Sequence, residues 1–251
     1  MLHPTFLNHA ENDFFCQEAI WLFSRDKKGP SRRKSFEENF GLKELLMAKL
    51  YFRYGTVGSA KTLNLLAVAH NYRQQGKKVL LMKPQLDVRF GREQIKSRAG
   101  LEMMAGIVIW EDTNLLDLVF EEIDCILVDE VQFLSGDIID QLRTITIERG
   151  VPVICYGLRS DFRSQLFAGS KRLMELADSI EEVKATCHFC NRKSIMNLKH
   201  VNATASLEGP SIQLGMEETY FPVCYACYAD QIAAVASQIW SLAIRVRRSA
   251  M

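Results

Sequence analysis

The 251-residue chain lacks any apolar run near the roughly 20 residues that a membrane-spanning helix needs. It also has no apolar segment behind a basic N-terminus, so we expect no secretory signal, a cytoplasmic location and no membrane partner. An excess of charge of one sign is missing too, because 31 Lys and Arg oppose 30 Asp and Glu. Proteins that bind nucleic acid mainly through its phosphates need a basic excess, so nucleic acid is not an expected partner.

Cysteine is not scarce, but its arrangement argues against disulfides. Two of the seven cysteines, Cys125 and Cys155, lie inside apolar runs and are predicted to be buried thiols. Four others form two C-x-x-C pairs that 33 residues separate, namely Cys187, Cys190, Cys224 and Cys227. In a reducing compartment this pattern favours a metal site. Four thiolates close a tetrahedral site, so we predict a structural zinc ion.

Residues 1–46 show no clean hydrophobic period, and a charged, breaker-rich linker crosses 25–34. We interpret this stretch as an N-terminal extension that is either disordered or not native. Met47 is the predicted natural start, and regular structure is expected from there onward.

From Leu50 onward, apolar strand-like runs alternate with helical runs. The run Cys125–Val128 is apolar throughout, as expected of a parallel strand that is covered on both faces. This alternation predicts an α/β fold with a parallel sheet flanked by helices. The predicted strands are 50–54, 78–83, 107–110, 124–128 and 152–157, and the predicted helices are 62–75, 114–121 and 136–148.

The C-terminal part changes character after Cys187, where short β-like pieces and turns follow. A helical pattern is predicted from Asp230 to Met251. Its apolar stripe favours packing on a neighbouring element or subunit over a membrane surface, and it comprises Ile232, Val235, Ile239, Leu242 and Val246.

A phosphate-binding loop is predicted between the strand 50–54 and the helix that follows. Small residues let backbone N–H groups surround an anion at a helix N-terminus. Lys61 would reach the β- and γ-phosphates, and the Thr62 hydroxyl would hold Mg²⁺. Ala60 replaces the second glycine of G-x-x-x-x-G-K-[ST], so the loop alone leaves an ordinary turn open. The predicted phosphate-binding residues are Gly55, Thr56, Val57, Gly58, Ser59, Ala60, Lys61 and Thr62.

A pair of acids, Asp129 and Glu130, ends an apolar strand 67 residues after Thr62. In phosphate-loop enzymes an Asp at this place organises Mg²⁺, and Glu130 would then act as general base for a hydroxyl nucleophile. The alternative, a strand that ends in exposed acids, is disfavoured because the two motifs occur together. A helicase is set aside, because nothing after Gly157 supplies a second motor domain.

Taken together, these motifs make the chain from about Met47 to Tyr228 resemble the zinc-containing, tetrameric thymidine kinases. The further motifs that carry the resemblance are Asp87–Gly91, Ser97–Gly100, Asp129–Phe133, Tyr156–Arg163 with Phe167, and Tyr220 before the second cysteine pair. The resemblance implies a P-loop (RecA-like) kinase domain over 47–182, a zinc-ribbon and lasso subdomain over 183–229, a C-terminal helix over 230–251, and a homotetramer.

The activity that this resemblance implies is ATP-dependent phosphorylation of the 5′-hydroxyl of thymidine or deoxyuridine, with ATP, Mg²⁺ and structural Zn²⁺ as cofactors. Glu130 matches the catalytic base, and Arg89 belongs to a motif near the phosphates, where it would stabilise charge. The lasso loop, which binds the base largely through backbone groups, corresponds to about 212–220. The residues implied around the nucleoside are Phe133, Leu158, Phe162, Phe167, Leu214 and Tyr220.

Four departures from the family pattern leave alternatives open. Ala60 replaces a glycine, Val57 a methionine near the thymine ring, Met216 a lasso glycine, and Tyr225 an arginine. Every residue with a chemical role is present, so we predict an active kinase. The alternatives are a non-catalytic nucleotide-binding relative and a zinc-ribbon ATPase that binds nucleic acid.

Overall fold

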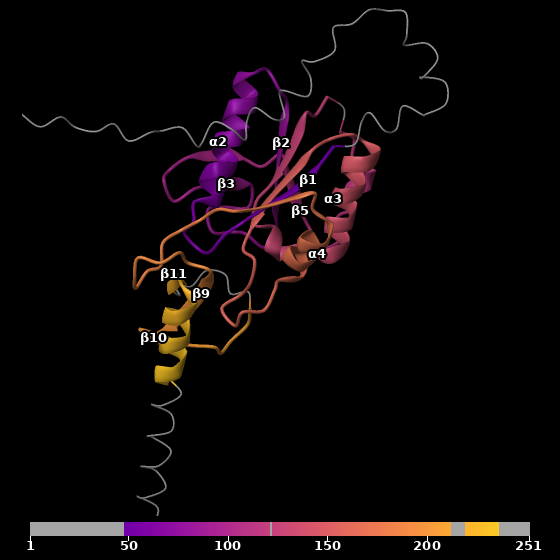
Figure 1. Cartoon of the computed structure of the whole chain (residues 1–251). Coiled ribbons are helices and arrows are strands. Elements are labelled where there is room, and N and C mark those ends of the chain that lie inside the picture. The colour runs from indigo at the N-terminus through magenta and orange to yellow at the C-terminus, as the bar shows by residue number, and fades with distance from the viewer. Residues whose placement is uncertain (1–47, 121, 212–218, 236–251) are drawn as a thin grey trace, which may run out of the picture. The chain divides into compact units, whose positions relative to one another are not determined.

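The computed structural model describes residues 48–120, 122–211 and 219–235 (Figure 1). All the described residues belong to one compact unit. Within the described ranges, no helix is long and apolar enough to cross a membrane. The predicted extension 1–46 lies outside the described residues.

A six-stranded, wholly parallel sheet forms the centre of this unit. This confirms the predicted α/β fold. All five predicted strands occur within one or two residues of their predicted bounds, and a sixth, β8, was not predicted. In spatial order the strands are β5 (Ile107–Ile109), β2 (Val79–Pro84), β6 (Cys125–Val128), β7 (Val153–Gly157), β1 (Leu50–Tyr54) and β8 (Ser179–Glu182).

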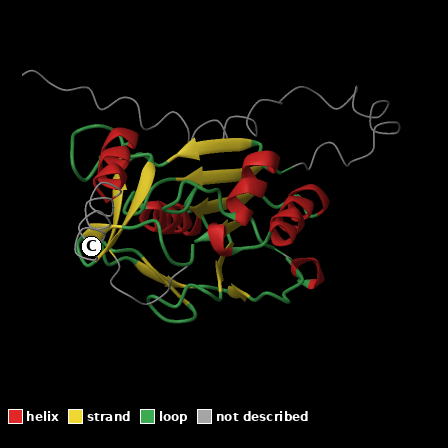
Figure 2. Cartoon of the chain, turned by 90° about the horizontal axis from the view of Figure 1, so that it is seen from below, coloured by secondary structure: helices red, strands yellow, loops and turns green. Residues whose placement is uncertain are grey.

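Helices cover both faces of the sheet, as Figures 1 and 2 show. Alternate residues of β6 pack on opposite sides: Cys125 and Leu127 join the cluster that contains α2 (Lys61–Gln74). Ile126 and Val128 join the cluster that contains α3 (Gly136–Glu148) and α4 (Ala168–Leu176). This two-sided burial explains why the strand is apolar at every position.

The predicted helix 114–121 is wrong, because only a 3₁₀ turn forms there, η2 (Leu115–Asp117). Asn114 caps this turn by accepting a hydrogen bond from the Leu116 N–H at 3.3 Å, and Leu118 is already extended. Leu115 is fully buried whereas Val119 is 76% exposed, so the segment offers no continuous apolar face that would stabilise a longer helix.

Five elements before the small sheet escaped prediction: the hairpin of β3 (Gln94–Lys96) and β4 (Glu102–Met104), the 3₁₀ turn η3 (Val131–Phe133), helix α4 and strand β8. Strand β8 has the sequence Ser-Ile-Glu-Glu, and Ile180 is 42% exposed at the sheet edge. A strand that packs few apolar side chains carries little periodic signal. Residues 179–182 form a strand because they pair with β1 in the sheet.

A second, antiparallel sheet has the order β10 (Thr204–Ala205), β9 (Met196–Val201) and β11 (Thr219–Val223). Helical structure follows over 225–235 and thus begins before the predicted Asp230. The side chains of Leu198, Val223 and Tyr228 form a small buried core with the cysteines. Residues 236–251 of the predicted helix lie outside the described residues.

Two glycines in helix first turns provide a matched test of the packing between α4 and the turn after β6. A Cβ at Gly169 would lie 2.5 Å from the Val131 carbonyl oxygen and 2.7 Å from that of Leu134, whereas at Gly136 its nearest neighbour would be Arg172 Cγ at 4.0 Å. We expect Gly169→Ala to lower the free energy of unfolding by about 1–3 kcal/mol.

Gly136→Ala is the control, and it should leave stability unchanged or raise it by up to about 1 kcal/mol. Urea unfolding of both variants measures the difference. Equal stabilities for the two variants would contradict the proposed backbone contact of α4.

Candidate active site

The loop between β1 and α2 has the backbone geometry of a phosphate cradle. Ala60 is the N-cap of α2 and adopts a left-handed conformation (φ 64°, ψ 26°), which costs a residue with a Cβ about 1–2 kcal/mol. Gly58 also has a positive φ, of 74°. Gly55 leaves no room for a side chain, because a Cβ there would lie 2.4 Å from the Ser59 hydroxyl oxygen. Ala60 therefore adopts the left-handed conformation that the glycine of the usual phosphate-loop motif would adopt at this position.

Lys61 is buried inside this loop. Its ammonium donates hydrogen bonds to the carbonyl oxygens of Thr56 (2.7 Å) and Gly55 (3.3 Å) and to the Ser59 hydroxyl (3.2 Å). Burial lowers the pKa of Lys61 to about 8, although the carboxylates of Glu130 and Asp129 act to raise it. A bound anion would therefore be stabilised by a cation that has already left bulk water.

The loop also reaches the carboxyl end of β6. Thr62 Oγ1 donates a hydrogen bond to Asp129 Oδ2 at 3.0 Å, although β7 lies between β1 and β6 in the sheet. Burial and, next, the neighbouring Glu130 raise the pKa of Asp129 to about 7, against the Thr62 hydrogen bond, which lowers it. Hydroxyl and carboxylate oxygens are the ligands that Mg²⁺ accepts, so these two side chains fit the predicted magnesium site.

Glu130 follows directly and begins a chain of ion pairs in which Glu130, Asp87 and Lys83 are buried and the Arg89 side chain is 40% exposed. The Arg89 guanidinium donates to Glu130 Oε1 through Nη2 and to Asp87 Oδ1 through Nε, the latter at 2.7 Å. The fully buried Lys83 contacts Asp87 Oδ2 at 3.2 Å. Burial raises the pKa of Asp87, but Arg89 and Lys83 outweigh it and hold that pKa below its usual range. The chain fixes Arg89 between two carboxylates.

Gln132 is a site residue that the sequence did not single out. Its Nε2 donates to Glu130 Oε2, and its Oε1 accepts the Leu158 N–H at 3.0 Å. Gly157 makes this approach possible, since a Cβ there would lie 2.6 Å from Gln132 Oε1. The Gln132 amide thus links the predicted base, Glu130, to the backbone that follows β7. Only its place two residues after Glu130 could have indicated it.

A cavity of about 290 Å³ lies between the loop and Glu130. Its lining includes Lys61, Thr62, Arg89, Glu130 and Leu158, all of which were predicted. Two cations with no predicted role, Lys96 and Arg98, also line it, because the end of β3 and the turn that leads to β4 lie beside the phosphate loop. The structure therefore brings the predicted phosphate and base residues to one space.

The predicted aromatic residues form two pairs. Phe133 and Phe167 meet edge to face with ring centroids 6.3 Å apart, and Phe162 and Tyr220 lie at the same separation. None of the four lines the 290 Å³ cavity in the described part of the chain. Phe162 is 1% exposed, which is the burial of a core residue.

Most of the predicted lasso, 212–220, falls on residues 212–218, outside the described residues, and this part includes the predicted Leu214. The chain just before it is held in place. Ser211 Oγ donates to Asp161 Oδ2 at 2.9 Å, and Arg163 Nη2 donates to the Gly209 carbonyl oxygen. The chain after it resumes with Tyr220 in β11, beside Phe162.

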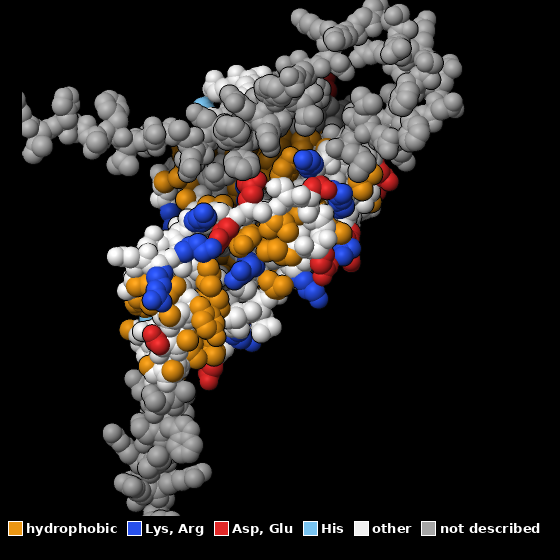
Figure 3. Space-filling model, viewed as in Figure 1, with side chains coloured by type: hydrophobic (Ala, Val, Ile, Leu, Met, Phe, Trp, Pro, Cys, Tyr) orange, Lys and Arg blue, Asp and Glu red, His pale blue; other side chains and the backbone are white. Residues whose placement is uncertain are grey.

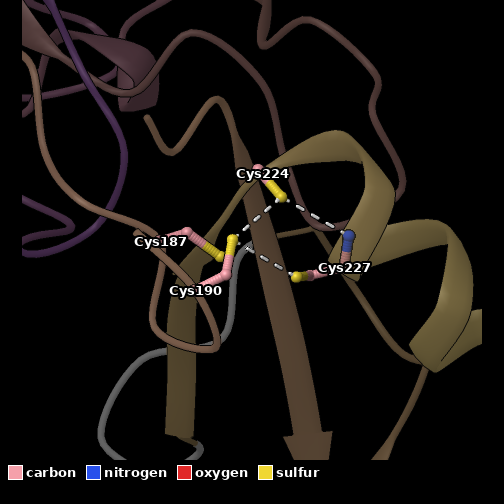
Figure 4. A group of neighbouring side chains, drawn as sticks. All are labelled: Cys187, Cys190, Cys224 and Cys227. Atoms are coloured by element: carbon pink, nitrogen blue, oxygen red, sulfur yellow. Dashed lines mark hydrogen bonds between the residues drawn. The ribbon is translucent and has the colours of Figure 1, made fainter. Parts of the chain in front are cut away.

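The four predicted cysteines form one cluster in which all the sulfur atoms lie within 4.8 Å of one another (Figure 4). Cys190 Sγ is 3.7 Å from the Sγ atoms of both Cys224 and Cys227. A tetrahedron with zinc–sulfur bonds of about 2.3 Å has edges of about 3.8 Å. The sulfur positions therefore fit a zinc ion, and His188 packs instead on the Phe221 ring with centroids 4.3 Å apart.

The family model that matches this chain is described as thymidine kinase, and it matches residues 48–228. The chain belongs to the thymidine kinase family. The thymidine kinase of Enterococcus faecalis is 44% identical over 185 residues, which cover 72% of this chain and 95% of the relative. That of Streptococcus gordonii is also 44% identical, with 72% and 96% covered. The relative from Lactiplantibacillus plantarum is 43% identical, with 71% and 94% covered.

Among solved structures, the Pif1 helicase of Candida albicans matches 56% of this chain and 37% of its own, at 14% identity and a TM-score of 0.35. This low similarity indicates nothing about the function of this thymidine kinase family member.

The buried carboxyl of Asp129 predicts a pH-dependent stability in protein without bound Mg²⁺. The folded state binds its proton more tightly than the unfolded state, so Asp129 destabilises the fold progressively as pH rises from about 4 to about 7. Asp129→Asn removes this charge and keeps an acceptor for Thr62. We expect it to be more stable than the wild type by about 2–4 kcal/mol at pH 8 and by almost nothing at pH 4.

Denaturant unfolding of purified protein without added Mg²⁺ or chelator, across this pH range, measures the difference. Asp137→Asn, at an exposed position in the first turn of α3, is the control and should show no such trend. A stability gain for Asp129→Asn that does not vary with pH contradicts the assigned pKa.

The sulfur cluster predicts that Cys187→Ser loses zinc and that the 187–227 segment unfolds with it, because metal binding and folding are coupled in such sites. Cys125→Ala, in β6 and outside the cluster, should retain the metal. Metal analysis with limited proteolysis measures both. One zinc per chain in purified Cys187→Ser refutes the assignment of Cys187 as a ligand.

Proposed function

We propose that this member of the thymidine kinase family transfers the γ-phosphoryl group of ATP to the 5′-hydroxyl of thymidine, and also of deoxyuridine. Thymidine kinase activity follows from family membership and from relatives that are 43–44% identical over nearly their whole length. One geometric observation supports the mechanism most directly. Thr62 bonds to Asp129 while Lys61 and Glu130 line a single cavity.

Phosphoryl transfer depends chiefly on positioning and on stabilising negative charge. Lys61 and the N–H groups at the start of α2 are proposed to bind the phosphates, and Arg89 is proposed to stabilise charge on the transferring group. Mg²⁺, when bound, would neutralise charge on the β- and γ-phosphates, and Thr62 and Asp129 are the residues proposed to hold it.

Glu130 is the proposed general base that accepts the proton of the 5′-hydroxyl. Its carboxylate is ordered on both oxygens, by Arg89 on Oε1 and by Gln132 on Oε2. Because both oxygens are held, the carboxylate keeps one orientation toward the cavity. A fixed orientation lowers the entropy cost of proton transfer.

The nucleoside is proposed to bind next to Leu158, between the cavity and the segments that flank the lasso. Phe133, Phe162, Phe167, Leu214 and Tyr220 remain predicted pocket residues, and the homotetramer remains a proposal from the resemblance. Leu158 supports this placement, because its side chain lines the cavity and its N–H binds the Gln132 amide that orients Glu130.

The competing functions are a non-catalytic relative and a nucleic-acid-binding ATPase. On the face in Figure 3, basic and acidic side chains are interspersed, which does not favour binding along a phosphate backbone. The replacement of glycine by Ala60 is no evidence for the non-catalytic relative, because the Ala60 backbone has the left-handed conformation that the phosphate loop needs.

The decisive assay incubates the protein with ATP and Mg²⁺ and, in turn, thymidine, deoxyuridine, deoxycytidine and deoxyguanosine. We expect thymidine monophosphate, and Glu130→Gln should lower kcat by about 10²–10⁴-fold because the base is lost. Lys61→Ala should also lose activity while it remains folded. Glu148→Gln, an exposed acid at the end of α3, is the matched control.

ATP binding without phosphorylation of any nucleoside would support the non-catalytic relative. ATPase activity that DNA stimulates, again without nucleoside phosphorylation, would support the third function. Full turnover in Glu130→Gln would remove the assignment of the base.

A further inference from the structure

A buried amide from the small sheet contacts the phosphate loop directly. Asn197 lies in β9 and is 4% exposed. Its Oδ1 accepts the Val57 N–H at 2.8 Å, and its Nδ2 donates to the Ser160 carbonyl oxygen at 2.9 Å. Both hydrogen-bonding atoms of this side chain are thus engaged, one by the loop after β1 and the other by the loop after β7.

A second contact joins the same two segments. The hydroxyl oxygens of Ser194 and Thr56 lie 2.9 Å apart, and Ser194 is 1% exposed. The Thr56 carbonyl oxygen accepts a hydrogen bond from Lys61. Two consecutive residues of the phosphate loop, Thr56 and Val57, are therefore held from outside the loop, next to the lysine that is proposed to bind phosphate.

The strand that carries Asn197 and its neighbouring strand are connected in turn to the cysteine cluster. Asn197 pairs with Pro222 across β9 and β11, and Pro222 stands two residues before Cys224. The Pro222 carbonyl oxygen also accepts the N–H of His188, which lies between Cys187 and Cys190. A metal ion on the four sulfur atoms would therefore fix the strand pairing that carries Asn197.

We propose that Asn197 is a positioning residue for ATP binding, through which the zinc-binding subdomain sets the shape of the phosphate loop. The inference rests on the proposed function, since it assigns the loop to ATP. Asn197 is not proposed to contact the nucleotide. It acts through Val57, and its removal would alter the loop rather than the chemistry.

The physical reason lies in how a phosphate loop binds an anion. The first N–H groups of α2 have no partner within the helix and are available to phosphate. They converge only if the loop before them is closed. Val57 stands between Gly55 and Gly58, both conformationally permissive, and the Asn197 hydrogen bond restrains the chain between them. Without it, ATP must order the loop when it binds.

The test is ATP binding to zinc-loaded Asn197→Ala, measured by calorimetry with Mg²⁺ and no nucleoside. We expect Kd for ATP to rise about five- to twentyfold, because one buried hydrogen bond to the loop is lost. At saturating ATP, kcat should stay within about twofold of the wild type, and the protein should keep one zinc per chain. A loss that is merely structural would change both constants and the zinc content.

Thr204→Ala is the matched control in the same sheet, because its exposed hydroxyl contacts only the Asn202 carbonyl oxygen, at 3.5 Å. It should leave Kd for ATP unchanged. If Asn197→Ala does not fold, Ser194→Ala replaces it, and a smaller rise in Kd with zinc retained is expected. An unchanged Kd in a folded, zinc-loaded variant at either position overturns the proposal for that contact.

Zinc removal gives a second, independent measurement. A zinc-selective chelator, with Mg²⁺ kept in excess, should weaken ATP binding in the wild type more than in Asn197→Ala, because the variant has already lost the connection. Equal weakening in both overturns the coupling to the metal site. Since these binding measurements need no turnover, they remain informative if thymidine is not phosphorylated, which is the outcome that would overturn the proposed function instead.

Discussion

The hydrogen bond between Thr62 and Asp129 is the interaction on which the rest of the candidate site depends. It joins the first turn of α2 to the end of β6 across the intervening β7. Parallel strands end at one edge of the sheet, so their C-terminal residues meet there although they are far apart in sequence. The apolar core on both faces fixes this edge, and the chemistry of the site is built on it.

Around that edge, the protein places buried charged groups next to partners, and only the Arg89 side chain among these charges is partly open to solvent, at 40% exposure. Lys61 lies among oxygen atoms of its own loop, and Arg89 lies between Asp87 and Glu130. Isolated buried charges would be costly, and each of these has a partner of opposite charge or a set of hydrogen-bond acceptors. The result is an ordered set of donors and acceptors in the cavity before any ligand binds, which lowers the cost of ordering them during phosphoryl transfer.

The small sheet with the four cysteines is connected to this site through hydrogen bonds rather than apolar contacts alone. Asn197 and Ser194 contact the phosphate loop, and Tyr228 donates its hydroxyl to the Phe162 carbonyl oxygen at 2.7 Å. Directional contacts of this kind fix the relative position of two segments more narrowly than apolar packing does. A structural metal can thereby influence a nucleotide site whose residues it does not touch.

The sequence by itself determined the features that local patterns encode. The parallel strands follow from continuous apolar runs, the loop from its small residues with Lys61, and the sulfur cluster from two C-x-x-C pairs. The tertiary structure decided what depends on distant pairing: strand β8, the collapse of 114–121 to a 3₁₀ turn, and the roles of Gln132 and Asn197. An amide side chain has no periodic signature. Asn197 meets Val57 across 140 residues of sequence, and only the folded chain brings them together.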